Sequence, residues 1–212
     1  MVYLIGAGPG DPGLITYKGL QILKSCDAVI YDRLGTGELL DLVRPDCAKI
    51  YVGKQAGAHY KKQEEINRIL VETAGKYENV VRLKGGDSFV FGRGGEEILT
   101  LQEADIPFQV IPGVTSAIAV PEVLGIPVTH REMSRSFHVI TGHTKKGEAD
   151  ALANIHKQEG TSVFLMGLSN LKPIMQRLRE EGESEETPVS VISNGMLPGE
   201  TIVRGTVGTI GK

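Results

Sequence analysis

A glycine-rich segment is the part of this sequence whose residue types are best suited to hold a ligand. Residues 82–97 contain Gly85, Gly86, Gly92, Gly94 and Gly95. Because glycine has no Cβ, such a segment can turn sharply and bring its backbone close to a bound molecule. The apolar pair Val80-Val81 precedes it and the acidic pair Glu96-Glu97 ends it. This pattern predicts a loop between a strand and a helix N-terminus, where acidic residues are favoured.

Polar residues follow three other predicted strands. Residues 6–11 come after the first strand, Asp32 after the second and Lys54 after the third. In an open parallel α/β sheet, ligands bind where the carboxyl ends of the strands meet. Each of these residues alone is typical of a solvated loop. Together with residues 85–87 they indicate one binding site at that edge of a sheet.

The first glycine turn partly matches a dinucleotide-binding motif. Residues 6–13 read Gly-Ala-Gly-Pro-Gly-Asp-Pro-Gly and follow a predicted strand. However, Asp11 stands where the fingerprint needs its third glycine. Pro9 and Pro12 also lack the N–H groups that a pyrophosphate would accept from. We therefore expect a turn that suits an uncharged or cationic ligand, and no nicotinamide or flavin cofactor.

The first half of the chain alternates short apolar runs with segments of helical spacing. The runs are rich in β-branched residues and span residues 2–5, 28–31, 50–52, 80–83 and 108–111. Such alternation predicts a mostly parallel sheet flanked by helices. The clearest predicted helix spans residues 63–76, where apolar residues recur at three- and four-residue spacing.

A second group of predicted elements follows residue 112. Its strands span residues 137–141, 162–166, 189–193 and 201–207, and its helices lie near residues 148–157 and 171–181. A short helix over residues 117–124, begun by Thr115 or Ser116 as N-cap, should bend or end early at Pro121. We therefore expect an α/β protein of two lobes, residues 1–112 and 113–212, each with a mostly parallel or mixed sheet flanked by helices.

The composition excludes several classes of protein. The net charge is −3 over 212 residues, so no nucleic-acid partner is expected, although positions 130–146 hold four basic residues and one acidic residue. No apolar run is long enough to cross a bilayer and the N-terminus reads as a strand, so we expect a cytoplasmic protein with no membrane partner. Cys26 and Cys47 lack CxxC spacing, which indicates neither a zinc site nor a disulfide.

With these motifs in order along essentially the whole chain, the sequence resembles the tetrapyrrole methylase family. The motifs are GAGPGDP at residues 6–12, YDRL at 31–34, YVGK at 51–54, QEEIN at 63–67, the glycine-rich segment at 82–97, IPGVTS at 111–116, GIPVTHR at 125–131 and FLMG at 164–167. Ser88 departs from the pattern, because the family has proline after Gly-Gly-Asp. We expect this change to loosen the loop without removing a contact group.

The resemblance implies a fold and a reaction. The fold is two α/β lobes, usually in a homodimer, with the cofactor between them, and it is unrelated to Rossmann-type methyltransferases. Family members continue past residue 208, so the resemblance predicts a second lobe without its last strand. The reaction is S-adenosylmethionine-dependent C-methylation of uroporphyrinogen III at C-2 and C-7. It gives precorrin-2 and S-adenosylhomocysteine, needs no metal, and leads to sirohaem or cobalamin.

Two other functions stay open beside this one. The first is a methylase that acts on a later corrin precursor within the same family. The second is a catalytically silent module that binds the cofactor or a tetrapyrrole. Such a module need not keep Asp32 or Lys54, and the sequence has both, which favours an enzyme.

The resemblance also assigns roles to residues. Asp32 matches the family's general base, which would assist loss of the pyrrole N–H proton, and Lys54 matches its general acid. Alternatively, both residues only position the substrate. The cofactor contacts would be Pro9, Gly85, Gly86, Asp87, Val90, Thr115, Ser116, Met166, Asn194 and Gly195. Without the resemblance, Met166 is more typical of a core residue at a strand end.

The implied substrate is a polycarboxylate, so cations should gather where it binds. Arginine suits this task because its planar fork pairs with carboxylates in bidentate fashion. The candidates are Arg33, Arg93, His130, Arg131 and Arg135. Arg135 is equally typical of an exposed loop.

Overall fold

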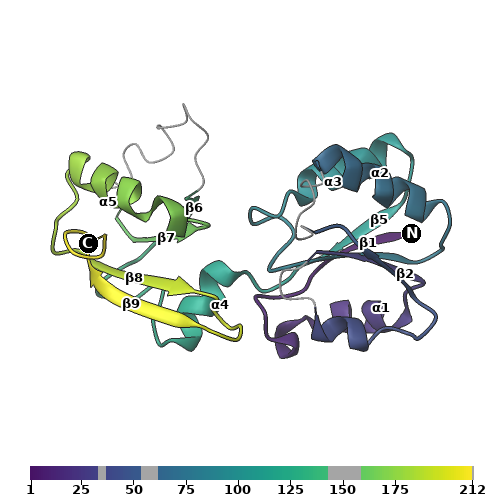
Figure 1. Cartoon of the computed structure of the whole chain (residues 1–212), viewed down its shortest axis with the longest axis horizontal. Coiled ribbons are helices and arrows are strands. Elements are labelled where there is room, and N and C mark those ends of the chain that lie inside the picture. The colour runs from purple at the N-terminus through teal and green to yellow at the C-terminus, as the bar shows by residue number, and fades with distance from the viewer. Residues whose placement is uncertain (33–36, 54–61, 143–158, 212) are drawn as a thin grey trace. The chain divides into compact units, whose positions relative to one another are not determined.

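The chain forms two units, Met1–Ser116 and Ala117–Lys212, in a computed structural model (Figure 1). The structure describes residues 1–32, 37–53, 62–142 and 159–211. Arg33, Lys54 and the helix predicted near residues 148–157 lie outside these ranges. Each unit has its own core, and the two are described separately.

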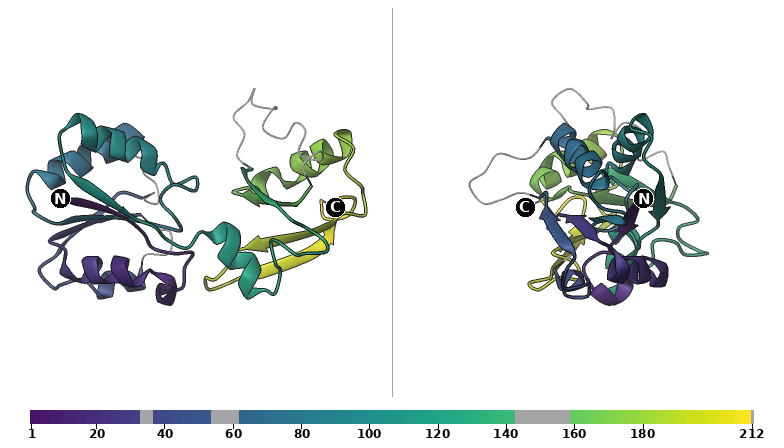
Figure 2. Two further views of the ribbon diagram at one scale, coloured as in Figure 1. Left: turned by 180° about the vertical axis from the view of Figure 1, so that it is seen from behind. Right: turned by 90° about the vertical axis from the view of Figure 1, so that its right-hand side faces the viewer.

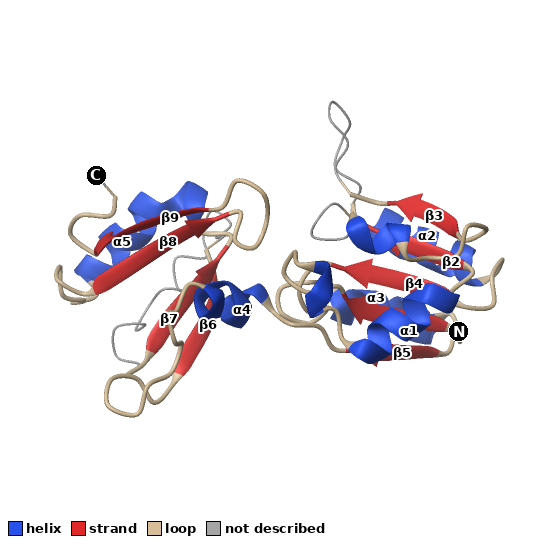
Figure 3. Ribbon diagram, turned by 90° about the horizontal axis from the view of Figure 1, so that it is seen from below, coloured by secondary structure: helices blue, strands red, loops and turns tan. Residues whose placement is uncertain are grey.

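The first unit is built on one sheet of parallel strands. The strands are β1 (Val2–Gly6), β2 (Ala28–Tyr31), β3 (Ala48–Tyr51), β4 (Val80–Lys84) and β5 (Phe108–Ile111). Their order across the sheet is β3-β2-β4-β1-β5, and every neighbouring pair is parallel. The predicted parallel sheet is confirmed. Because the strands run the same way, the loops that follow them lie at one edge of the sheet (Figure 3).

Helices cover both faces of this sheet, as Figure 1 and Figure 2 show. One face carries α1 (Tyr17–Ser25), and the other carries α2 (Gln63–Ala74) and α3 (Gly94–Glu103). The α1 side packs Ile5, Val29 and Leu83 of the sheet with Leu23. The other side packs Leu4 and Ile30 with Leu70 and Leu101. Neighbouring strand residues thus enter opposite cores, as the two-residue period of a strand requires.

The glycine-rich loop folds back on itself before α3. A Cβ on Gly92 would lie 2.5 Å from the carbonyl oxygen of Ser88, and a Cβ on Gly94 would lie 2.6 Å from the same atom. The N–H of Gly94 donates to that carbonyl at 3.0 Å. Close packing therefore requires glycine at both positions. Arg93 between them has a left-handed φ of 57°.

The second unit is assembled from smaller pieces. The parallel pair is β6 (Phe137–Thr141) with β7 (Thr161–Leu165), and the antiparallel pair is β8 (Pro188–Ser193) with β9 (Thr201–Thr206). Residues Ile174, Met175 and Leu178 of α5 (Leu171–Glu180) pack with apolar side chains of both pairs. The helix α4 (Ser116–Val123) contains Pro121 and continues for two residues beyond it, to one residue before the predicted end.

Short 3-10 helices span Pro12–Leu14 (η1), Glu38–Asp41 (η2) and Leu168–Asn170 (η5). Across the described ranges, no helix combines the length and the apolar character needed to cross a membrane.

Candidate functional site

Three glycines pack backbone against backbone at the carboxyl edge of the first sheet. Gly6 ends β1, Gly86 follows β4, and Gly113 follows β5. A Cβ on Gly6 would lie 2.5 Å from the Cα of Gly113 and 2.6 Å from the carbonyl oxygen of Gly86. Gly8 and Gly86 also exchange backbone hydrogen bonds, with N···O distances of 2.7 and 3.2 Å. The loops that follow β1, β4 and β5, three neighbouring strands of the sheet, therefore pack tightly against one another.

Asp87 connects the loop after β4 to the loop after β5. Its Oδ1 accepts a hydrogen bond from the N–H of Phe89 at 2.8 Å, and its Oδ2 accepts one from the N–H of Gly113 at 3.0 Å. A carboxylate oxygen can accept more than one hydrogen bond. Asp87 thus holds the loop and leaves a negative charge at the edge of the sheet.

The same loops border open space. Gly86 has a φ of 66°, and a Cβ built on it would meet no atom within 4 Å. Pro9 lies between Gly8, with φ 83°, and Gly10, with φ 150°. The pairing of Gly8 with Gly86 brings the loop that contains Pro9 beside the loop that contains Gly85, Gly86 and Asp87. A backbone cradle beside a carboxylate is suited to a ligand with a positive group.

The remaining predicted cofactor contacts lie on other elements. Val90 is half-buried in the loop before α3, and Thr115 and Ser116 lie half-buried where β5 leads into α4. In the second unit, Met166 follows β7 and is 57% exposed, so its interpretation as a core residue is wrong. Asn194 and Gly195 follow β8, which belongs to a different pair of strands.

Asp32 lies at the carboxyl end of β2, where the sequence predicted it. Its side chain is 26% exposed, and its Oδ2 accepts a hydrogen bond from Nη2 of Arg82 at 3.4 Å. Arg82 belongs to the neighbouring strand β4, and its side chain is only 3% exposed. Asp32 is therefore both accessible and held by a buried cation.

Arg82 belongs to a buried ion-pair network that the sequence reasoning missed. Glu97 of α3 is fully buried, and its Oε1 accepts from Nε of Arg82 at 3.0 Å and from Nζ of Lys84 at 2.9 Å. Gln63 of α2 contacts the same oxygen at 3.5 Å. Glu97 is thus a counterion for two strand cations. Glu97 also lies in the first turn of α3, as predicted, so the role as a counterion adds to that interpretation.

The position of Lys84 perturbs its charge. Burial lowers the pKa of the Lys84 amine, and the nearby Arg82 cation lowers it further, while Glu97 opposes the shift. A signal for this network was present in the sequence, because Arg82 and Lys84 alternate with Val81 and Leu83. That two-residue spacing places both cations on one face of a strand.

The predicted cations that the structure describes are all exposed. Arg93 precedes α3, and its Nε donates to Glu96 at 2.9 Å. His130, Arg131 and Arg135 lie in the second unit, between α4 and β6. A turn there is closed by hydrogen bonds between the backbones of His130 and Ser134. Arg33 and Lys54 lie outside the described residues.

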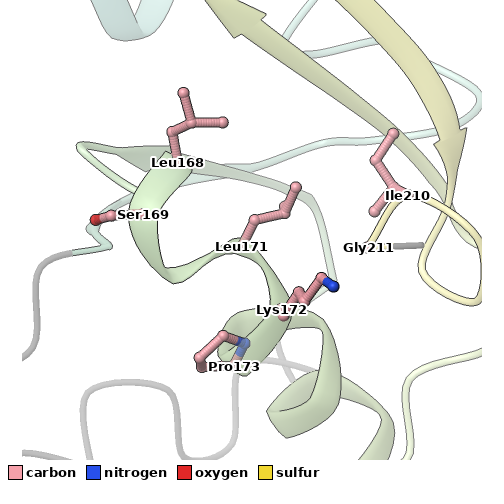
Figure 4. A pocket seen from close by; sticks show the side chains of 7 residues that line it. All are labelled: Leu168, Ser169, Leu171, Lys172, Pro173, Ile210 and Gly211. Carbon is pink, nitrogen blue, oxygen red and sulfur yellow. The ribbon is translucent and has the colours of Figure 1, made fainter.

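A cavity of about 460 Å³ lies elsewhere in the second unit (Figure 4). It is lined by Leu168, Ser169, Leu171, Lys172, Pro173, Ile210 and Gly211. None of the predicted site residues is among them. Within the described part of the chain, no group of three or more His, Cys, Asp or Glu side chains is arranged to hold a metal.

Comparison with known proteins places these features in a family. Residues 1–211 match the family of Tetrapyrrole (Corrin/Porphyrin) Methylases. A uroporphyrinogen-III C-methyltransferase from Methanocaldococcus jannaschii is 53% identical over 99% of this chain and 87% of its own length. A siroheme synthase from Escherichia fergusonii is 48% identical, and the chain spans 46% of that longer protein.

Solved structures of the same family resemble this chain. The uroporphyrin-III C-methyl transferase of Thermus thermophilus, complexed with S-adenyl homocysteine, matches 99% of this chain and 90% of its own, with a TM-score of 0.81 and 37% identity. The cobalt precorrin-4 methyltransferase CbiF matches 98% of this chain and 85% of its own, with a TM-score of 0.84 and 30% identity. The expected departure from the Rossmann-type fold is confirmed. The chain belongs to the tetrapyrrole methylase family.

Proposed function

We propose that this chain transfers methyl groups from S-adenosylmethionine to C-2 and C-7 of uroporphyrinogen III. The product would be precorrin-2, an intermediate for sirohaem or cobalamin. The observation that carries this proposal is the 53% identity with a uroporphyrinogen-III C-methyltransferase over 99% of the chain. The resemblance also predicts a homodimer, and the sequence composition predicts a cytoplasmic protein.

The methyl donor is assigned to the glycine-lined edge of the first sheet. Gly85 and Gly86 would offer backbone groups, Asp87 would face a positive group of the donor, and Pro9 would border it. The open space at Gly86 supports this assignment. When bound, S-adenosylmethionine supplies a methyl group on a positively charged sulfonium. Further proposed contacts are Val90, Thr115, Ser116, Met166, Asn194 and Gly195.

Asp32 is the proposed general base. A pyrrole carbon that gains a methyl group draws electron density from the ring nitrogen, so the N–H proton becomes more acidic. A carboxylate that is partly exposed at the sheet edge can accept this proton. Lys54 is the proposed general acid, which would return a proton to the macrocycle. In the alternative, both residues only position the substrate.

Cations are proposed to hold the substrate's carboxylates. Arg93, His130, Arg131 and Arg135 are exposed, which suits a role at the mouth of a site. Arg33 is proposed for the same role. Arginine would give bidentate contacts that fix the orientation of the macrocycle.

A second candidate is methylation of a later corrin precursor. The TM-score of 0.84 with cobalt precorrin-4 methyltransferase favours it. The sequence identity of 30% to that enzyme is lower than the 53% to the uroporphyrinogen-III enzyme, so we place it second.

An anaerobic assay of the purified chain with S-adenosylmethionine and uroporphyrinogen III tests the proposal. We expect the absorbance of precorrin-2 to appear and binding of S-adenosylhomocysteine to be measurable by calorimetry. Binding without turnover would reject this substrate in favour of a later corrin. Asp32→Asn should keep the binding and lower turnover by about 100-fold or more. Unchanged turnover would remove the base role.

A further inference from the structure

The buried charges of β4 lie on a face that is otherwise apolar. Val80, two residues before Arg82, packs with Leu4 and Ile30 of the neighbouring strands. Arg82 and Lys84 instead bring cations to this face, with side chains 3% and 6% exposed. A buried ion pair stabilises a fold no better than apolar residues of similar size, because desolvation offsets the attraction. Packing alone therefore gives no reason for charges here.

The guanidinium of Arg82 is held from two sides. Its Nε donates to Oε1 of Glu97 at 3.0 Å, and its Nη1 donates to the carbonyl oxygen of Leu83 at 3.0 Å. The group is planar and rigid, so these two bonds fix the direction of the third nitrogen. That nitrogen, Nη2, lies 3.4 Å from Oδ2 of Asp32.

The register of the sheet brings the two residues together. Arg82 pairs with Ile30 of β2, and Leu83 pairs with Tyr31, the residue before Asp32. Asp32 therefore leaves the sheet beside the strand that carries Arg82. Its carboxylate is 26% exposed and so remains accessible to solvent while Arg82 contacts it.

From these contacts we infer that Arg82 is a positioning residue, which Glu97 and the Leu83 carbonyl orient so that it holds the Asp32 carboxylate at the carboxyl edge of the sheet. The inference rests on the proposed function, in which Asp32 meets the substrate. Arg82 itself acts only through Asp32. A lysine at position 82 carries the same charge but has no rigid fork, so it cannot keep all three contacts.

A double-mutant cycle on turnover tests this role. We expect Arg82→Lys to lower kcat by about 10- to 100-fold, because a small misplacement of a reacting group is costly. Binding of S-adenosylhomocysteine should stay unchanged. In the Asp32→Asn background, the same substitution should change kcat less than about 2-fold. If the loss of kcat in the double variant equals the product of the losses in the two single variants, the two residues act independently and the inference is overturned.

Two further variants sharpen the test. Glu97→Gln keeps the shape of the side chain but weakens its hold on Arg82, so kcat should fall in the wild-type background and not in Asp32→Asn. Arg44→Lys is the matched control, because Arg44 is 44% exposed and pairs with Asp27 and Asp46 away from this network. Its kcat should equal that of the wild type.

The contact can also be tested without any activity. The same cycle on the unfolding equilibrium constant should show a coupling of about 2- to 100-fold between Arg82 and Asp32. No coupling would overturn the inference even if the enzyme is active. If wild-type turnover is absent but the coupling is present, the substrate assignment fails and the contact stands.

Discussion

Asp87 and Gly113 join two loops that are 26 residues apart in the chain, through a hydrogen bond of 3.0 Å from the Gly113 N–H to Oδ2 of Asp87. The bond spans the end of β1, which lies between β4 and β5. It is possible only because Gly6 at that end has no side chain. The shape of the proposed cofactor site is therefore set by backbone contacts and one carboxylate.

Removing this carboxylate should loosen the site. Asp87→Ala leaves the N–H groups of Phe89 and Gly113 without their acceptor, which should lower the free energy of unfolding by about 1–3 kcal/mol. Binding of S-adenosylhomocysteine should weaken as well. Asp87→Asn keeps an acceptor oxygen but not the charge, so it should retain more stability than alanine. Urea unfolding and calorimetry measure both effects. Wild-type binding by Asp87→Ala would show that the site does not depend on this tether.

The glycines at the edge should respond differently to a methyl group. Gly113→Ala places a Cβ 2.6 Å from the Cα of Gly6, so the backbone must shift, at a cost of about 1–3 kcal/mol or more. Gly86→Ala meets no atom within 4 Å and should cost about 1–2 kcal/mol for its left-handed φ. However, the new methyl group, and a larger Leu still more, should block the cofactor.

Gly95→Ala is the control for this pair. Gly95 also has free space around its Cβ direction, and it lies in the first turn of α3. Alanine there should raise the free energy of unfolding by up to about 1 kcal/mol and leave binding unchanged. Calorimetry with S-adenosylhomocysteine separates the outcomes. Normal affinity in Gly86→Ala and Gly86→Leu would move the cofactor site elsewhere.

Much of the first sheet could be predicted because its strands are short runs that are rich in β-branched residues. The bounds of β2 and β5 agree with the prediction. The strand β3 begins at Ala48 and not at residue 50, because the edge strand of a sheet tolerates the exposed Lys49 that broke the apolar pattern. Local pattern thus identifies a strand more reliably than it identifies its ends.

The contacts that shape the site depend on the order of the strands, which local pattern does not contain. Gly6 and Gly113 meet because β1 and β5 are neighbours. Glu97 meets Arg82 because α3 returns over the face of β4 that carries the arginine. The two-residue spacing of Arg82 and Lys84 contains the signal for a shared face, which the sequence analysis did not use, but the spacing does not contain their partner Glu97.

Lys84 should make the free energy of unfolding depend on pH in the alkaline range. Its pKa in the folded chain is lowered from the ordinary 10.5, so between the folded value and 10.5 the unfolded chain binds a proton that the folded chain has released. Its contribution to stability is therefore full above 10.5 and is lost as pH falls through the folded pKa. Lys84→Met should lack this slope. Urea unfolding from pH 7 to 10.5 compares the two proteins, and parallel curves would contradict the prediction.

The two cysteines should make stability depend on pH in the opposite sense to Lys84. Their sulfur atoms lie 3.6 Å apart in the core, and burial, followed by the neighbouring Cys47, raises the pKa of Cys26 from 9.0 to about 12. The thiol's contribution is present below pH 9.0 and is lost as pH rises toward 12. We expect both thiols to react with a disulfide reagent at pH 8 only after urea is added. Rapid labelling of the native chain would show that the core opens.

Ser88 should be a weak point of the glycine-rich loop. It is fully buried, and its Oγ has no hydrogen-bond partner among the described residues. Its carbonyl, which accepts from Gly94 at 3.0 Å, does not depend on the side chain. Ser88→Pro removes the unpaired hydroxyl and restricts the unfolded chain, so it should raise the free energy of unfolding by about 1 kcal/mol.

Ser88→Ala separates these two causes, because it removes the hydroxyl without adding a ring. If Ser88→Ala raises the free energy of unfolding as much as Ser88→Pro does, the unpaired hydroxyl is the cause of the lower stability. If only Ser88→Pro raises it, the cause is the conformational entropy of the unfolded chain. A loss of stability in Ser88→Pro would mean that the φ at this position does not suit proline. Since Asp87 precedes it, the proline variant should also hold the tether to Gly113 more firmly. A slower hydrogen exchange of the Gly113 N–H would measure this directly.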